Sequence, residues 1–141
     1  MVNGFTLIEL LVTLAVISLL MLVATVLVFS AYRDVQANQV AQNFKNLKTA
    51  IDVYFATVHE LPKARYASST VLTDYISHLP AGYEIAFDTV FNTDNTAAAT
   101  IVYIGGNAKF ADISKNNPEV RQLTVDTYID LPGVEIRIVK W

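Results

Sequence analysis

The chain has 141 residues, a formal net charge of −3 and no cysteine. This length holds one globular domain, and the missing cysteines exclude a disulfide framework, thiolate metal sites and a Cys nucleophile. The basic residues are scattered among a slight excess of acids, so the charge does not favour nucleic acid as a direct partner. Hydrophobic residues make up 53% of the chain, and they are concentrated near the N-terminus.

An apolar run without charge, Pro or Gly extends from Leu10 to Tyr32. At about 1.5 Å per residue, a helix of this length crosses a bilayer. A cleaved secretory signal would be shorter, would follow basic residues and would end in a small-residue cleavage site. Here only Met1 to Gly4 precede the apolar stretch, and Arg33 follows it, which predicts a retained membrane helix.

A single carboxylate, Glu9, lies near the start of this apolar stretch, which begins at Phe5. A carboxylate in lipid is costly unless it is interfacial, protonated or paired, so it points to a function. Two interpretations stay open from the residues alone. Glu9 is either an interfacial residue solvated by headgroups or a residue used in assembly.

The sequence around Glu9 reads Gly4-Phe5-Thr6-Leu7-Ile8-Glu9-Leu10-Leu11. A polar leader ending in Gly, an aromatic residue, a Thr-Leu-hydrophobic-Glu run and a long apolar helix occur in this order. In this pattern the chain resembles the superfamily of type IV pilins and type II secretion pseudopilins.

The resemblance implies a site for processing and assembly. A prepilin peptidase would cut between Gly4 and Phe5 on the cytoplasmic side and methylate the new amine of Phe5, and a Gly at the cut has no side chain to clash. Glu9 would pair with the Phe5 amine of a neighbouring subunit, each charge offsetting the desolvation of the other. Such a pair would set the axial register of the helices.

Two features depart from the family pattern. The leader Met1 to Gly4 carries no Lys or Arg, so the charge distribution does not itself support an N-terminus inside the cell. Many pilins also have Gly and Pro in the apolar helix, whereas this chain has neither between Phe5 and Leu61. Ser18 and Thr25 can bond back to the preceding turn and soften the helix slightly.

Beyond Arg33 the helical pattern continues as one amphipathic stripe. Its apolar positions are Val40, Phe44, Leu47, Ile51, Tyr54, Phe55 and Val58. We therefore predict one helix from Phe5 to about His59, ended by Leu61-Pro62. The expected segments are a leader at 1–4, a membrane or filament-core helix at 5–32, its amphipathic half at 33–61 and a globular head at 62–141.

The head has strand patterns separated by turn-forming residues. The expected strands cover Tyr83 to Phe91, Thr100 to Ile104, Leu123 to Ile129 and Val134 to Val139. The expected turns are Asn92 to Asn95, Gly105 to Asn107 and Leu131 to Gly133, and Ser114 to Glu119 is the clearest loop. Tyr75-Ile76 and Leu79-Pro80 resemble a small connecting helix of the pilins. The predicted fold is α+β, the type IV pilin fold, with the long helix packed on about four mainly antiparallel strands.

Enzymatic constellations are missing from the sequence. His59-Glu60 begins like a zinc-protease helix, but the second His is absent and Pro62 would break that helix. His78 has no neighbouring metal-ligand partner, and the Gly105-Gly106 pair favours a hairpin turn over a phosphate loop. We predict no enzyme activity, no cofactor and no metal.

The only weak calcium candidates are oxygen-bearing residues near one predicted turn: Asp88, Asn92, Asp94 and Asn95. Ca²⁺ uses such ligands, but the spacing matches no calcium loop, and Asx-rich hairpin tips are common.

The expected function is a structural subunit of a type IV pilus or pseudopilus-like filament. Its expected partners are further copies or other pilins, the prepilin peptidase and a membrane assembly platform. The expected location is the inner membrane, crossed once with the N-terminus inside, and then a periplasmic or extracellular filament. The alternative is a monomeric binding domain that uses the helix only as an extracytoplasmic anchor.

Overall fold

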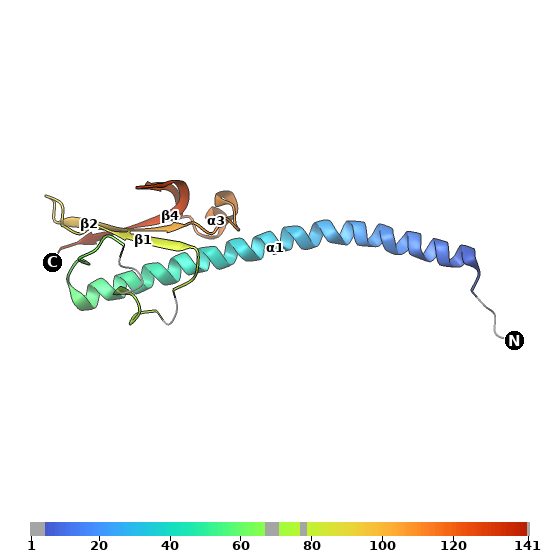
Figure 1. The fold of residues 1–141 in the computed structure, drawn as a ribbon, viewed down its shortest axis with the longest axis horizontal. Coiled ribbons are helices and arrows are strands. Elements are labelled where there is room, and N and C mark those ends of the chain that lie inside the picture. The colour runs from blue at the N-terminus through green and yellow to red at the C-terminus, as the bar shows by residue number, and fades with distance from the viewer. Residues whose placement is uncertain (1–4, 67–70, 77–78, 141) are drawn as a thin grey trace. The chain divides into compact units, whose positions relative to one another are not determined.

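The long N-terminal helix, α1, runs without a break from Leu7 to Val58. It belongs to a computed structural model that describes residues 5–66, 71–76 and 79–140 (Figure 1). Contacts divide the chain into two compact units, Met1–Val35 and Gln36–Trp141, and α1 passes from the first into the second. The side chains of Ser18 and Thr25 donate hydrogen bonds to carbonyls four residues earlier, at 2.8 and 2.7 Å, without interrupting the helix. The predicted single helix is confirmed.

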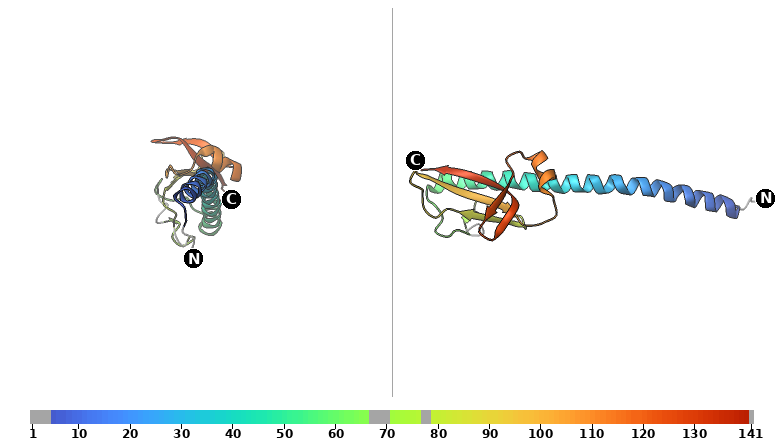
Figure 2. Two further views of the ribbon diagram at one scale, coloured as in Figure 1. Left: turned by 90° about the vertical axis from the view of Figure 1, so that its right-hand side faces the viewer. Right: turned by 90° about the horizontal axis from the view of Figure 1, so that it is seen from above.

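The second unit contains an antiparallel sheet of four strands in the order β1-β2-β4-β3. The strands are β1 (Tyr83–Phe87), β2 (Thr96–Tyr103), β3 (Arg121–Val125) and β4 (Tyr128–Val139), and a short helix, α3 (Phe110–Asn116), precedes β3. Within this unit the sheet covers one side of the C-terminal half of α1 (Figure 2). This arrangement confirms the predicted α+β fold.

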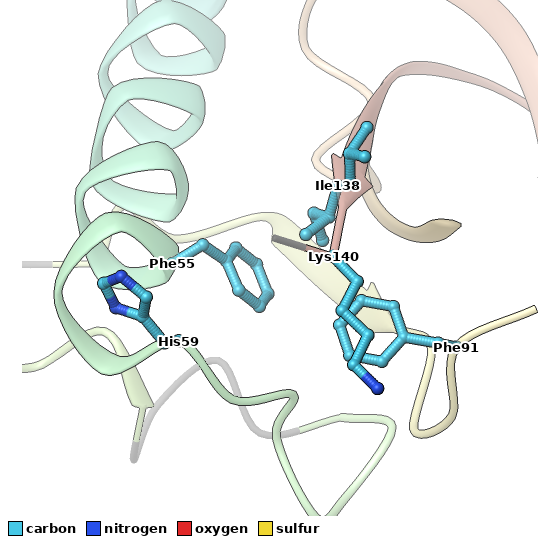
Figure 3. A pocket seen from close by; sticks show the side chains of 6 residues that line it. Phe55, His59, Phe91, Ile138 and Lys140 are labelled. Carbon is cyan, nitrogen blue, oxygen red and sulfur yellow. The ribbon is translucent and has the colours of Figure 1, made fainter. Parts of the chain in front are cut away.

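The end of α1 is marked by His59, which has a positive φ of 61°. Its backbone N–H still donates to the Phe55 carbonyl at 3.2 Å, so this residue closes the last turn in a left-handed conformation. Figure 3 shows His59 at this end of the helix, beside Phe55. Because the helix ends at Val58, His59-Glu60 cannot present metal ligands from a helical surface.

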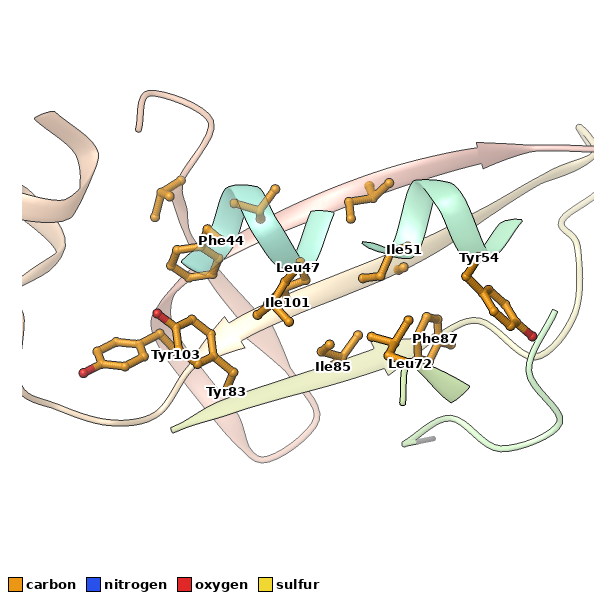
Figure 4. Packing of buried hydrophobic residues seen from close by; sticks show 14 of the residues in the cluster. Phe44, Leu47, Ile51, Tyr54, Leu72, Tyr83, Ile85, Phe87, Ile101 and Tyr103 are labelled. Carbon is orange, nitrogen blue, oxygen red and sulfur yellow. The ribbon is translucent and has the colours of Figure 1, made fainter. Parts of the chain in front are cut away.

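The core lies between one face of α1 and the inner face of the sheet (Figure 4). Phe44, Leu47 and Ile51 are fully buried and pack with residues from β1, β2 and β4. The Phe44 and Tyr83 rings meet edge to face with centroids 5.4 Å apart, a favourable aromatic geometry. Of the predicted apolar stripe only Val58, at the helix end, is exposed.

The outer face of the sheet carries a second, smaller cluster formed by Ala86, Val102 and Val125 with Tyr128 against them. The tip of the β3–β4 hairpin is also tied to the segment after α1. There the Asp126 carboxylate accepts hydrogen bonds from Arg65 Nε, at 3.0 Å, and from the Tyr66 hydroxyl. These bonds lower the pKa of Asp126, with the Tyr66 hydroxyl as the largest cause.

Two predicted features of the β3–β4 region are wrong. The run Leu123 to Ile129 is not one strand, because β3 and β4 are joined by a turn at Asp126 and Thr127, where Asp126 has a φ of 50°. Leu131 to Gly133 is not a turn but lies inside β4. Pro132 fits there because β4 pairs only with β3 at that position, so one side of the strand needs no backbone donor.

Other boundaries also differ from the sequence-based expectation. β2 begins at Thr96, four residues before the predicted start, and the stretch from Ser114 begins inside α3, which buries Ile113 completely. A helical turn occurs near the expected connecting helix, where the Ile76 N–H donates to the Leu72 carbonyl at 2.9 Å. His78 lies outside the described residues.

We predict that Gly133→Ala destabilises the head. A Cβ atom at this position would lie 2.7 Å from the Ile101 carbonyl oxygen. This oxygen belongs to the backbone of β2, so it can move away only if the strand is distorted. The expected loss is about 2 kcal/mol, measured by urea unfolding. Gly106→Asn is the control, because Gly106 has a positive φ but open space around it, and Asn tolerates that conformation. Equal stability of Gly133→Ala and the natural chain would contradict the close approach.

A second prediction is that the unit from Gln36 onward, which combines the head with the amphipathic half of α1, folds without the apolar half. Deleting Met1 to Tyr32 should leave a soluble, folded domain, because the unit from Gln36 onward contains its own core. Within that domain Phe44→Ala should cost about 3 kcal/mol, since the ring is fully buried. Val53→Ala, on the exposed side of the same helix, should change stability by less than about 0.5 kcal/mol. An unfolded circular dichroism spectrum of the truncated chain would contradict the prediction.

Candidate functional site

The start of α1 is closed by a reciprocal pair of hydrogen bonds between Thr6 and Glu9. The Thr6 backbone N–H donates to Glu9 Oε2 at 2.9 Å, and the Glu9 backbone N–H donates to Thr6 Oγ1 at 3.3 Å. The Thr6 hydroxyl also donates to Glu9 Oε2 at 2.7 Å. This is a capping box, in which two side chains satisfy backbone donors that the first helical turn leaves without partners.

The capping box gives Glu9 a role within its own chain, and sequence reasoning missed it. The signal was present as Thr-x-x-Glu directly before an apolar run. All of these hydrogen bonds use Oε2, and within the described residues Oε1 accepts none. Glu9 therefore keeps one carboxylate oxygen for a further donor while it caps the helix.

Phe5 and Glu9 lie on the same surface of the N-terminal segment. Together with Ile8, Val12 and Thr13 they line a shallow hollow of about 360 Å³. The Phe5 side chain is 84% exposed. Gly4, the other residue of the predicted cleavage site, lies outside the described residues.

Every residue from Phe5 to Val35 is exposed, although most of those before Arg33 are apolar. Among the described residues, α1 is the one helix long and apolar enough to cross a membrane. Leaving large apolar side chains in water is unfavourable, so this surface needs lipid or other helices around it.

The weak calcium candidates are engaged in local hydrogen bonds. Asp88 Oδ2 accepts from the Ala98 backbone at 2.8 Å, and Asp94 Oδ1 accepts from the Thr96 hydroxyl at 2.6 Å. Asp94 Oδ2 also forms an ion pair with Arg137 at 3.2 Å. Within the described residues, no group of three or more His, Asp or Glu side chains could hold a metal ion.

A small cleft of about 230 Å³ lies beside the end of α1, between Phe55, His59, Phe91 and Lys140 (Figure 3). The Lys140 ammonium lies 5.5 Å from the centroid of the Phe91 ring, in cation–π range. Apart from His59 and Lys140, the described residues that line the cleft are apolar: Phe55, Phe91, Ile138 and Val139. Its volume is below that of ordinary small-molecule sites.

Comparison with known proteins agrees with the N-terminal site. Residues 1–25 match the model of the prokaryotic N-terminal methylation motif, which is the signature of type IV pilins and pseudopilins. No curated protein and no solved structure matches the chain. The motif supports a type IV pilin-like or pseudopilin precursor, and with the apolar helix it is consistent with a membrane-anchored protein.

Proposed function

We propose that this chain is a structural subunit of a type IV pilus or pseudopilus-like filament. The observation that carries the proposal is the methylation motif joined directly to an exposed apolar helix and followed by a second compact unit with its own core. In the membrane, lipid covers the apolar half of α1. In a filament, the same surface packs against the equivalent helices of other subunits.

Processing comes first in this proposal. A prepilin peptidase removes Met1 to Gly4 and methylates the new amine of Phe5, leaving the helix anchored with its N-terminus inside and its head outside. Phe5 is highly exposed and precedes the first helical residue, Leu7, so its backbone is accessible to a protease. Assembly then needs a membrane platform that moves subunits out of the bilayer.

Glu9 provides the specificity of assembly. Lipid is as apolar as the helix, so apolar contact alone gives helices little reason to leave it. A charge pair between Glu9 and the Phe5 amine of the next subunit favours one arrangement. The capping box is compatible with this pairing, because among the described residues Glu9 Oε1 accepts no hydrogen bond while Oε2 accepts those from Thr6.

We expect mass spectrometry of the protein from its host to show a chain that begins at N-methylated Phe5. Gly4→Leu should block cleavage and leave the full-length chain in the membrane, because a bulky side chain does not fit where Gly does. Asn3→Ala is the control and should be cut normally. Surface filaments that retain Met1 would contradict the proposal, and a retained Met1 without filaments would favour a simple anchor.

The role of Glu9 is tested by three variants expressed without natural subunits. Glu9→Ala leaves the neighbour's amine without its partner, a loss on the order of 3 to 5 kcal/mol per contact, so filament yield should fall to background. Glu9→Gln keeps a side chain that can form a capping box but removes the charge, and it should be nearly as poor. Thr6→Val removes the cap hydroxyl and keeps the carboxylate, so filaments should persist.

The measurement is the yield of surface filaments together with the membrane pool of processed subunit. Each variant should insert, be cut and fold its head normally. Normal filaments from Glu9→Ala would mean that the carboxylate is only interfacial. A failure of Thr6→Val equal to that of Glu9→Gln would instead assign the defect to the helix cap.

A further inference from the structure

Part of β4 is an open edge of the sheet. β4 pairs with β3 only up to Gly133 and with β2 from Gly133 to Val139. From Val134 to Val139 it therefore has a strand neighbour on one side only, among the residues that the structure describes. An unpaired strand edge presents backbone donors and acceptors to any second strand.

The backbone groups that face this open side belong to Glu135, Arg137 and Val139. Residues of a strand direct their N–H and C=O groups alternately to the two sides. The Lys140 N–H donates to the Asn95 carbonyl at 2.9 Å, on the β2 side, so the even-numbered residues of this segment face β2. The Asp88 N–H donates to the Ala98 carbonyl at 2.9 Å, so the backbone groups of Ala98 face β1 and not β4. Arg137, which lies opposite Ala98 in the register, therefore directs its own backbone groups away from β2, to the open side.

A groove of about 660 Å³ borders this edge between Val134 and Arg137. It is bordered by Glu135 and Arg137 of β4, by Arg121 of β3 and by Lys48 and Glu119. Lys48 Nζ lies 2.8 Å from Glu119 Oε2, so these two charges are already paired. The side chains of Glu135 and Arg137 are exposed on the same face of the sheet. Arg137 already forms an ion pair with Asp94 at 3.2 Å through one guanidinium nitrogen. Because a guanidinium has five N–H donors, it can bind a second carboxylate as well.

Glu135 and Arg137 limit how two such edges can pair. If two copies pair antiparallel about Glu135, the two Glu135 side chains lie opposite each other. If they pair about Arg137, the two Arg137 side chains do. Both registers are unfavourable because they place like charges together. In the register centred on Ile136, each Glu135 lies opposite the Arg137 of the second copy. In that register Glu135 and Arg137 of the two copies can also exchange backbone hydrogen bonds, because the backbone groups of both residues face the open side.

We propose that the β4 edge from Glu135 to Val139 is a self-association surface that pairs two copies of this chain, antiparallel about Ile136. The interface is isologous, with the same residues contributed by both copies. A helical filament runs all its subunits in one direction, so a two-fold pair joins subunits of two filaments or subunits not yet assembled. The pairing itself does not depend on filament formation.

Cysteine cross-linking tests the register, because the natural chain has no cysteine. Opposed residues of a hydrogen-bonded pair have Cα atoms about 5.5 Å apart, within the range that a disulfide spans. Full-length Glu135→Cys and Arg137→Cys chains, which carry tags of different size, are mixed in detergent and oxidised mildly. The micelles are in excess over the protein, so that each micelle holds at most one chain. The mixture should give roughly ten-fold more disulfide dimer than either variant alone.

The named outcomes separate the alternatives. Dimers from Arg137→Cys alone, at the level of the mixture, would overturn the register in favour of one centred on Arg137. Glu60→Cys is the control, because Glu60 is exposed and lies outside β4. If the mixture gives no more disulfide dimer than this control, the proposal that the β4 edge self-associates is overturned.

Charge exchange gives an independent readout by sedimentation equilibrium of the same micelles. Glu135→Arg and Arg137→Glu should each weaken dimerisation by about ten-fold, since each puts like charges opposite one another. The double variant restores opposite charges and should return to within about three-fold of the natural chain. A double variant as weak as the single ones would overturn the proposal, provided that thermal melting shows all heads folded. Loss of filaments with intact pairing would count against the proposed function only.

Discussion

The exposed apolar surface of α1 is the constraint on which the rest of the molecule depends. From Phe5 to Val35 no side chain is covered by the chain's own fold, and the apolar run to Tyr32 contains no charge after Glu9. Water is a poor environment for such a surface, and lipid or neighbouring helices are good ones. Two environments therefore suit the N-terminal half of the protein, a lipid bilayer and a bundle of neighbouring helices, and the proposed function would use both in turn.

The same helix also organises the head. After Gln36 its buried positions recur every three or four residues, and the sheet supplies the opposing apolar face. One continuous element thus has an apolar surface all around in its first half and an apolar stripe in its second. Because α1 is unbroken across the boundary at Val35, no loop separates the anchoring segment from the segment that belongs to the core.

The sequence predicted the features that depend on long periodic patterns. The extent of α1, the buried face from Val40 to Phe55 and the antiparallel sheet all follow from spacing that repeats over many residues. It failed where the signal is local. Pro132-Gly133 carries the residue types of a turn but lies in a strand, and the real turn at Asp126-Thr127 lacks glycine.

The short helix α3 was missed for a related reason. Its seven residues include no strong periodicity, and its one fully buried side chain, Ile113, contributes through tertiary contacts that a local pattern does not contain. At the candidate site, Glu9 was recognised by its position, but its bond to Thr6 was not. A lone carboxylate in an apolar segment directs attention to partners outside the chain, whereas its nearest partner was three residues away.

The unbroken helix has a mechanical consequence. An α-helix rises about 1.5 Å per residue and an extended chain about 3.3 Å, so a helix that opens locally gives a fibre extra length under tension. Opening begins most easily at Gly or Pro, and this chain has neither between Phe5 and Leu61. Within any fibre built on this helix, local opening would therefore lack its two easiest starting residues, which favours a core that resists lengthening under tension.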